Sequence, residues 1–243
     1  MKLKIIYNEP AAVVGEWLII SDLHLGGPGS ADWRATVQVV DGLMEMERKR
    51  HLLILGDVKS PITSTSGEAG KFIREIGSKY DLHITKGNHD GNIEKYAGYC
   101  TVYGAGGAIL CRDRIIEPKE AVGGRLSSCI GILHGHAWPA RELVQCGMVM
   151  IGHIHPSLIF GKEWKRKEKV WIFGRLNTEE VGEHYGKGVK VNKNIRLVCM
   201  PAFGHSSYST REGRERALSP LTSENIFIKS SAEIYLLNGI QAR

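Results

Sequence analysis

Histidine and carboxylate residues in this chain gather directly after short apolar runs, and this pattern constrains the fold more than any other feature. Six of the ten histidines occur in four such clusters. Loops at the carboxyl ends of strands are where α/β folds place their sites, because rigid strands hold both ends of each loop. The pattern therefore predicts an α/β fold with one polar site along a strand edge.

The apolar runs have the length and composition of buried strands. They cover residues 17–20, 52–55, 82–85, 129–133, 148–151, 170–173 and 196–200. Helical spacing of apolar residues in 32–50, and again at Phe72, Ile73 and Ile76, indicates that strand and helix alternate at first.

After about residue 160 the helical periodicity disappears. We expect strands joined by polar loops there, the longest at 204–220, and a closing strand or hairpin within 225–237. The charged run at 161–169 is typical of a solvated hairpin loop.

Two motifs follow the first two runs. Asp22 and His24 are two residues apart, so in extended backbone both side chains can converge on one cation. In Gly56-Asp57 the glycine permits close backbone approach, and the carboxylate has two oxygens with which to bridge two metals. Either motif alone could arise by chance.

A more specific motif, Gly87-Asn88-His89-Asp90, follows the third run. The amide oxygen of Asn88 could ligate a hard cation. His89 could lie over a substrate and protonate a leaving alkoxide, with Asp90 supporting its charge. The alternative is an Asn/Asp-rich turn without chemistry.

Two H-x-H pairs, His134/His136 and His153/His155, follow the runs at 129–133 and 148–151. Four imidazoles at one edge are costly to bury unless each ring has a metal or a hydrogen-bond partner. A single such histidine would more often be structural, whereas four at equivalent positions indicate a metal site.

The ordered motifs resemble the signature of the calcineurin-like metallophosphoesterase superfamily, D-x-H, GD, GNH[DE], H and GH-x-H. The resemblance implies one domain over residues 1–243, folded as an α/β four-layer αββα sandwich of two mixed sheets. It further implies two divalent cations, the first held by Asp22, His24, Asp57 and His155, and the second by Asp57, Asn88, His134 and His153. Asp57 would bridge them, and metal-activated water would hydrolyse a phosphodiester bond.

In this family pattern His89 stabilises the phosphoryl oxygens or protonates the leaving group. His136 is left as a substrate contact or a neighbour of the ligands. His205 is the remaining histidine that the resemblance would bring near the site, and we assign His51, His83 and His184 no role beyond surface or packing.

Nitrogen and oxygen ligands without thiolate favour Mn²⁺, with Fe²⁺, Ni²⁺ or Zn²⁺ as alternatives. The segments Met200-Pro201-Ala202-Phe203 and Ser219-Pro220 resemble an archaeal and bacterial subgroup related to the nuclease subunit SbcD. The loops Val58-Lys59-Ser60 and 26–29 depart from that subgroup, which leaves substrate preference open.

Composition bears on the substrate and the location. Residues 161–243 carry 15 basic and 9 acidic side chains, against 17 of each in 1–160, and this asymmetry favours a polyanion such as DNA. The alternatives are a phosphohydrolase of small nucleotides or phosphomonoesters, and a scaffold that lost catalysis. Five scattered cysteines disfavour disulfides, and with no leader or membrane span in the sequence we expect a cytoplasmic protein. A homodimer is left open.

Overall fold

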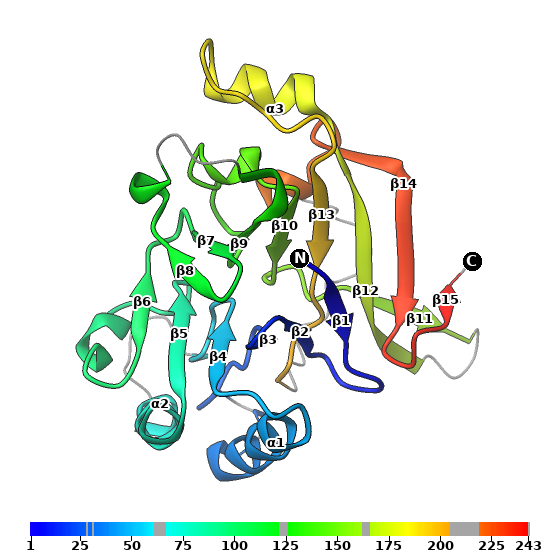
Figure 1. Ribbon diagram of the computed structural model, residues 1–243. Coiled ribbons are helices and arrows are strands. Elements are labelled where there is room, and N and C mark those ends of the chain that lie inside the picture. Colours follow the sequence, from blue (N-terminus) through cyan, green and yellow to red (C-terminus); the bar gives the residue numbers. More distant parts are fainter. Residues whose placement is uncertain are drawn as a thin grey trace.

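The computed structural model describes residues 1–27, 29–30, 32–60, 67–121, 126–161, 166–204 and 219–242. Two β-sheets pack against each other, and helices lie outside them (Figure 1). The sequence predicts this mixed α/β sandwich, and the prediction is confirmed. No helix within the described ranges is long and apolar enough to cross a membrane.

The first sheet has six strands in the order β1-β2-β3-β4-β5-β6. Strands β3 to β6 are parallel, and β1 and β2 extend the sheet antiparallel at one edge. Helix α1 (Trp33–Met46) connects β3 to β4, and α2 (Gly67–Lys79) connects β4 to β5. The strands are β1 Leu3–Ile5, β2 Ala12–Val14, β3 Trp17–Ile20, β4 His51–Ile54, β5 Asp81–Thr85 and β6 Thr101–Tyr103.

The second sheet has nine strands in the order β15-β14-β12-β13-β10-β9-β7-β8, with β11 paired to β12. Strands β9, β10 and β13 are parallel to one another, and the other pairs are antiparallel. Helix α3 (Thr178–Tyr185) lies between β12 and β13 in the chain. The strands are β7 Ala108–Cys111, β8 Arg114–Ile116, β9 Ile130–Leu133, β10 Met148–Ile151, β11 Ser157–Phe160, β12 Arg166–Leu176, β13 Arg196–Cys199, β14 Phe227–Leu236 and β15 Gln241–Ala242.

Strand β3 shows how the layers are held together. Trp17 and Ile19 belong to the core between the two sheets, while Leu18 and Ile20 belong to the core under α1 and α2. Successive side chains of a strand point to opposite faces, so an unbroken apolar run serves both cores. Burying each such side chain stabilises the folded state by about 1.5–3 kcal/mol. This stabilisation fixes the position of the strand, and therefore the point at which its polar loop begins.

One sequence prediction for the region after residue 160 is wrong, and another is confirmed in part. Helix α3 lies where no helix was expected; it begins at the cap Asn177, whose side chain accepts from two backbone amides, and it buries Val181. The hairpin predicted at the charged run is present between β11 and β12, but residues 166–169 of the run belong to β12 and not to the loop. Residues 162–165 of that run, and His205 with most of the 204–220 loop, lie outside the described residues.

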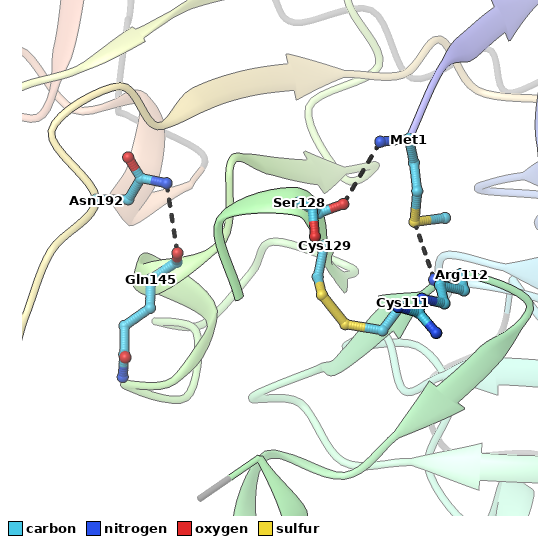
Figure 2. Close-up of a disulfide and its surroundings, with 7 residues drawn as sticks. All are labelled: Met1, Cys111, Arg112, Ser128, Cys129, Gln145 and Asn192. Carbon is cyan, nitrogen blue, oxygen red and sulfur yellow. Dashed lines mark hydrogen bonds between the residues drawn. A yellow bond between two sulfur atoms is a disulfide. The ribbon is translucent and has the colours of Figure 1, made fainter. Parts of the chain in front are cut away.

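A disulfide joins Cys111 to Cys129, contrary to the prediction from cysteine spacing (Figure 2). The neighbouring residues Leu110 and Ile130 are partners in the antiparallel pairing of β7 and β9. The next pair along the same register is Cys111 and Cys129, whose Cα atoms are 4.7 Å apart. That spacing suits a disulfide, and it arises from strand pairing that the linear sequence does not show.

Candidate metal centre

The five predicted motifs meet where the carboxyl ends of the parallel strands of both sheets converge. Asp22, Asp57 and Asn88 follow β3, β4 and β5, and the two H-x-H pairs follow β9 and β10. Each of three groups of side chains brings one ligand atom per residue within 4.8 Å of the others. These groups are Asp22/His24/His155, His24/Asp57/His89 and Asp57/His134/His153.

The first predicted cation position is surrounded by two imidazoles and two carboxylates. His24 Nε2 lies 3.2 Å from His155 Nε2, and His155 Nε2 lies 3.1 Å from Asp22 Oδ1. Asp57 Oδ2 lies 3.7 Å from His24 Nε2. Asp22, His24 and His155 therefore each bring a donor atom within 4.8 Å of the others, and Asp57 approaches this group through His24.

The second predicted position is centred on His134. Its Nε2 lies 3.1 Å from His153 Nδ1, 3.2 Å from Asn88 Oδ1 and 3.3 Å from Asp57 Oδ2. Its Nδ1 lies 2.8 Å from the Leu55 carbonyl oxygen and so carries the hydrogen, which directs Nε2 toward the other three atoms. The same oxygen of Asp57, Oδ2, faces both positions, as a bridging ligand requires.

The donor chemistry fits divalent cations. Two pairs of imidazole nitrogens face each other at 3.1–3.2 Å beside carboxylate and amide oxygens. Of these residues Asp22, His24, Asp57 and His134 are buried, His153 and His155 are half-buried, and Asn88 is exposed. Nitrogen and oxygen acceptors brought together in this way repel one another unless a proton or a cation lies between them. Six of the seven predicted ligands are histidine or aspartate, a set that suits the first-row transition metals.

The backbone is strained at the ligands. Nine non-glycine residues have positive φ in the described ranges, and five of them are Asp22, His24, Asp57, His153 and His155. A left-handed non-glycine residue costs about 1–3 kcal/mol and persists where the surrounding structure enforces it, most often at functional sites. Close packing does so here: a Cβ on Gly152 would lie 2.4 Å from Asp22 Oδ2.

The protonation states of the site depend on burial and on the paired charges. Burial lowers the pKa of His24 to about 4, so this ring is neutral at neutral pH. Burial also acts to lower the pKa of His134, but its hydrogen bond to Asp57 and the charges of Asp22 and Asp57 raise it to about 9. Burial opposes ionisation of Asp57, yet the hydrogen bond and charge of His134 lower its pKa overall.

His89 and Asp90 occupy different environments. His89 Nδ1 contacts the Ser60 carbonyl oxygen, and its ring centroid lies 5.1 Å from that of His24, at the edge of the first cation position. The fully buried Asp90 carboxylate accepts hydrogen bonds from the amides of Gly87 and of residues 57–59. It thus ties the GNHD loop to the GD loop, and any support for His89 acts through the backbone.

His136 lies beside the ligands. Its ring centroid is 5.3 Å from that of His134 and 6.0 Å from that of His153, and its buried Nδ1 has no hydrogen-bond partner among the described residues. Burial and the charge of His134 lower its pKa. Elsewhere, His51 and His83 both contact Asp81, and His184 stacks on Trp138.

One residue near the site was missed by the sequence analysis. The Lys169 ammonium is largely buried and donates to the carbonyls of Phe203 and Gly204, behind the Asp22 loop. The residue lies in the charged run that was expected to be solvated. Residues two apart in a strand share a face, so the local sequence does not distinguish Lys169 from the exposed Lys167 in β12.

Comparison with known proteins identifies the family. A family model described as calcineurin-like phosphoesterase matches residues 17–173. Among solved structures, the nuclease MPE of Pseudomonas putida is 16% identical with a TM-score of 0.56, and the alignment covers 98% of each chain. The phosphoesterase YfcE of E. coli is 14% identical with a TM-score of 0.44, over 93% of this chain and 96% of that one. No curated protein matches the sequence significantly.

Proposed function

Because the chain belongs to the calcineurin-like phosphoesterase family and is a metal-dependent phosphoesterase, we propose that it hydrolyses phosphodiester bonds at a dinuclear centre. The observation that carries this proposal is Asp57 Oδ2, which lies 3.7 Å from His24 Nε2 and 3.3 Å from His134 Nε2. A single carboxylate oxygen between two sets of imidazole nitrogens suits two adjacent cations.

In this proposal Asp22, His24 and His155 hold one cation with Asp57, and Asn88, His134 and His153 hold the other with Asp57. Bound divalent cations would supply Lewis-acid stabilisation of the phosphoryl group and lower the pKa of an attacking water. We expect Mn²⁺, with Fe²⁺, Ni²⁺ or Zn²⁺ as alternatives, because the ligands combine imidazole with carboxylate and lack thiolate.

His89 is the proposed catalytic residue among the protein side chains. The Ser60 carbonyl oxygen accepts a hydrogen bond from His89 Nδ1, which leaves His89 Nε2 to contact the substrate. When Nε2 is also protonated, the imidazolium can donate to a phosphoryl oxygen or pass that proton to the leaving group, and the ring is then neutral. Asp90 supports this role by fixing the loop that carries His89, and His136 remains a candidate substrate contact.

For the substrate we propose DNA or another nucleic acid, with a relationship to the SbcD-type nucleases. The excess of basic residues in 161–243 supports a polyanionic substrate, since cationic side chains that contact phosphates release counterions. The second candidate is a small nucleotide or phosphomonoester, favoured by the absence of an appended nucleic-acid-binding fold among the described residues.

The remaining parts of the proposal concern location and assembly. We propose a cytoplasmic protein, although the Cys111–Cys129 disulfide argues for an oxidising compartment or an organism in which intracellular disulfides persist. A homodimer is supported by the exposed apolar residues Ile159 and Phe160 on β11, and sedimentation velocity tests it.

The decisive experiment compares hydrolysis of bis-p-nitrophenyl phosphate with that of p-nitrophenyl phosphate. Metal-stripped protein is assayed alone and after addition of Mn²⁺, with His89→Ala as the active-site variant and His184→Ala as the matched control on α3. A metal-dependent diesterase that is lost in the first variant and kept in the second supports the proposal.

Other outcomes separate the alternatives. Preference for the monoester favours the small-molecule phosphohydrolase. Metal binding without hydrolysis of either ester by any transition metal favours a scaffold that lost catalysis. If the diester is preferred, salt-dependent binding of DNA then tests the nucleic-acid substrate.

A further inference from the structure

The half-buried Lys169 side chain reaches residues 203 and 204, which lie against the loop that carries Asp22. Its Nζ donates to the Phe203 carbonyl oxygen at 3.2 Å and to the Gly204 carbonyl oxygen at 3.1 Å. Burial lowers the pKa of Lys169 to about 8, while the charges of Glu9 and Asp22 act to raise it. A buried ammonium is costly unless its donors are satisfied, so these two carbonyl contacts account for its position.

Residues 203 and 204, whose carbonyls accept from Lys169, are in turn hydrogen-bonded to the loop that carries Asp22. Phe203 N donates to Ser21 O at 2.7 Å, and Gly204 N donates to Asp22 O at 3.0 Å. The Ser21 hydroxyl donates to the Pro201 carbonyl at 3.3 Å. Residues 201–204 therefore run alongside the Asp22 loop and hold its backbone.

Gly204 is required for this close approach. A Cβ at this position would lie 2.1 Å from the Leu23 carbonyl oxygen and 3.1 Å from the Asp22 carbonyl oxygen. Any larger residue would push the segment away from the loop whose Asp22 and His24 have positive φ. The contact thus helps to enforce a strained backbone at two ligands.

The backbone around Lys169 also reaches the other side of the same cation position. Lys169 pairs with Ser157 in the register of β11 and β12, and Val170 N donates to Pro156 O at 3.0 Å. Pro156 directly follows His155. Lys169 thus lies between residues 203–204, which hold the Asp22 loop, and strand β11, which begins after His155.

We propose that Lys169 is a positioning residue for the cation held by Asp22, His24 and His155, and that it leaves the second cation position unaffected. This inference rests on the proposed dinuclear function. It adds a selective effect on one cation, because among the described residues the hydrogen bonds of the Lys169 ammonium go to Phe203 and Gly204 and not to the His134 loop or the GNHD loop. Without the Lys169 ammonium, the carbonyls of residues 203 and 204 lose their hydrogen-bond donor. These residues then hold the Asp22 loop less firmly.

The test measures Mn²⁺ binding by calorimetry for the wild type and for Lys169→Met, Lys169→Arg and Lys167→Met. We expect the wild type to bind two equivalents, and Lys169→Met to bind one with unchanged affinity and the other at least about tenfold more weakly, as for other supports of metal ligands. Lys169→Arg should restore binding to within about threefold, because guanidinium keeps the donors. Lys167→Met, on the same strand but exposed, should behave as the wild type.

Electron paramagnetic resonance provides a second readout that does not depend on catalysis. At two equivalents of Mn²⁺ the wild type should give the spectrum of a coupled pair, and Lys169→Met that of an isolated bound ion. Equal and full binding of both equivalents by Lys169→Met overturns the inference. So does equal weakening of both sites, because that would reflect a general loss of structure.

Gly204→Ala tests the same link if Lys169→Met does not fold. Selective weakening of one equivalent supports the inference, and unchanged binding of both overturns it. Failure of the wild type to bind two cations would refute the dinuclear function itself. Two bound cations in the wild type with no selective effect in either variant would refute the role of Lys169 alone.

Discussion

Breaking the Cys111–Cys129 disulfide should lower stability by an amount that follows from its position in the chain. The bond closes a loop with a sequence separation of 18 residues. Loop-closure entropy for that length corresponds to about 3 kcal/mol at 25 °C. For a chain of this size each kcal/mol shifts Tm by about 2–4 °C, so we expect a decrease of about 6–12 °C.

The assay is thermal and urea unfolding of the protein with and without dithiothreitol. The matched control is Cys111→Ala/Cys129→Ala, which should unfold near the reduced wild type and should not respond to the reductant. Thiol titration after denaturation should find three free thiols in the oxidised protein, since Cys100, Cys146 and Cys199 are unpaired. In the native protein these three are buried and should react slowly.

Two results would refute this reasoning. Five thiols in denatured, unreduced protein would mean that strand pairing alone brings the sulfurs together without a bond. A disulfide that is present but whose reduction leaves Tm unchanged would mean that the loop between β7 and β9 is already constrained in the unfolded chain, so that closing it removes little entropy. Strands β7 and β9 pair directly with each other, so the thiol count and the change in Tm distinguish these two results.

Further predictions concern the metal centre. Asp57→Asn should remove the bridge, so that metal analysis finds at least one equivalent lost and kcat falls about 10³-fold, the effect of losing several kcal/mol of charge stabilisation. His89→Gln should keep both metals but lower kcat by about 10²–10⁴-fold, and retained full activity would exclude His89 as the acid. His134 has a raised pKa of about 9 in the metal-free protein, so Mn²⁺ binding near pH 7 should release a proton. Calorimetry in two buffers measures that release, and apparent affinity should rise with pH until about 9. Without metal, the stability from His134 is fully present below its unfolded pKa of about 6.5 and is lost as pH rises through about 9.

The strand ends and the positions of the motifs that follow them could be predicted because both are local features of the sequence. Strands β3 and β10 have the bounds that the apolar runs predict, and the others differ by a few residues. Each candidate ligand is within a few residues of such a run, so parallel strands bring the candidates of each sheet to one edge, and the packing of the two sheets brings the two edges together. The distances between motifs, which decide whether they form one site, come from the pairing of strands far apart in sequence.

Features that depend on long-range pairing or on few buried residues could not be predicted. Helix α3 buries Val181 alone, which gives no apolar periodicity, although the cap Asn177 and the terminating Gly186 mark its ends. The disulfide required the register of β7 against β9. Lys169 resembles a surface lysine in sequence, and only the fold of residues 201–204 against it makes it part of the site.

Strain at the proposed ligands gives a physical reason for the proposed dependence of the site on residues beyond the family match, which ends at 173. Five ligands in left-handed backbone would together cost about 5–15 kcal/mol, comparable to the whole stability of a domain. Local sequence cannot hold them, because Asp22, His24 and Asp57 lack the freedom of glycine. The hydrogen bonds from residues 203 and 204 to the Asp22 loop therefore help to hold its strained backbone. Metal binding also stabilises this backbone, since a cation that requires the strained conformation favours it by its own binding free energy. It follows that substitutions in 201–204, which lie after β13 and far from the motifs in sequence, should weaken the first cation position before they reduce the stability of either sheet.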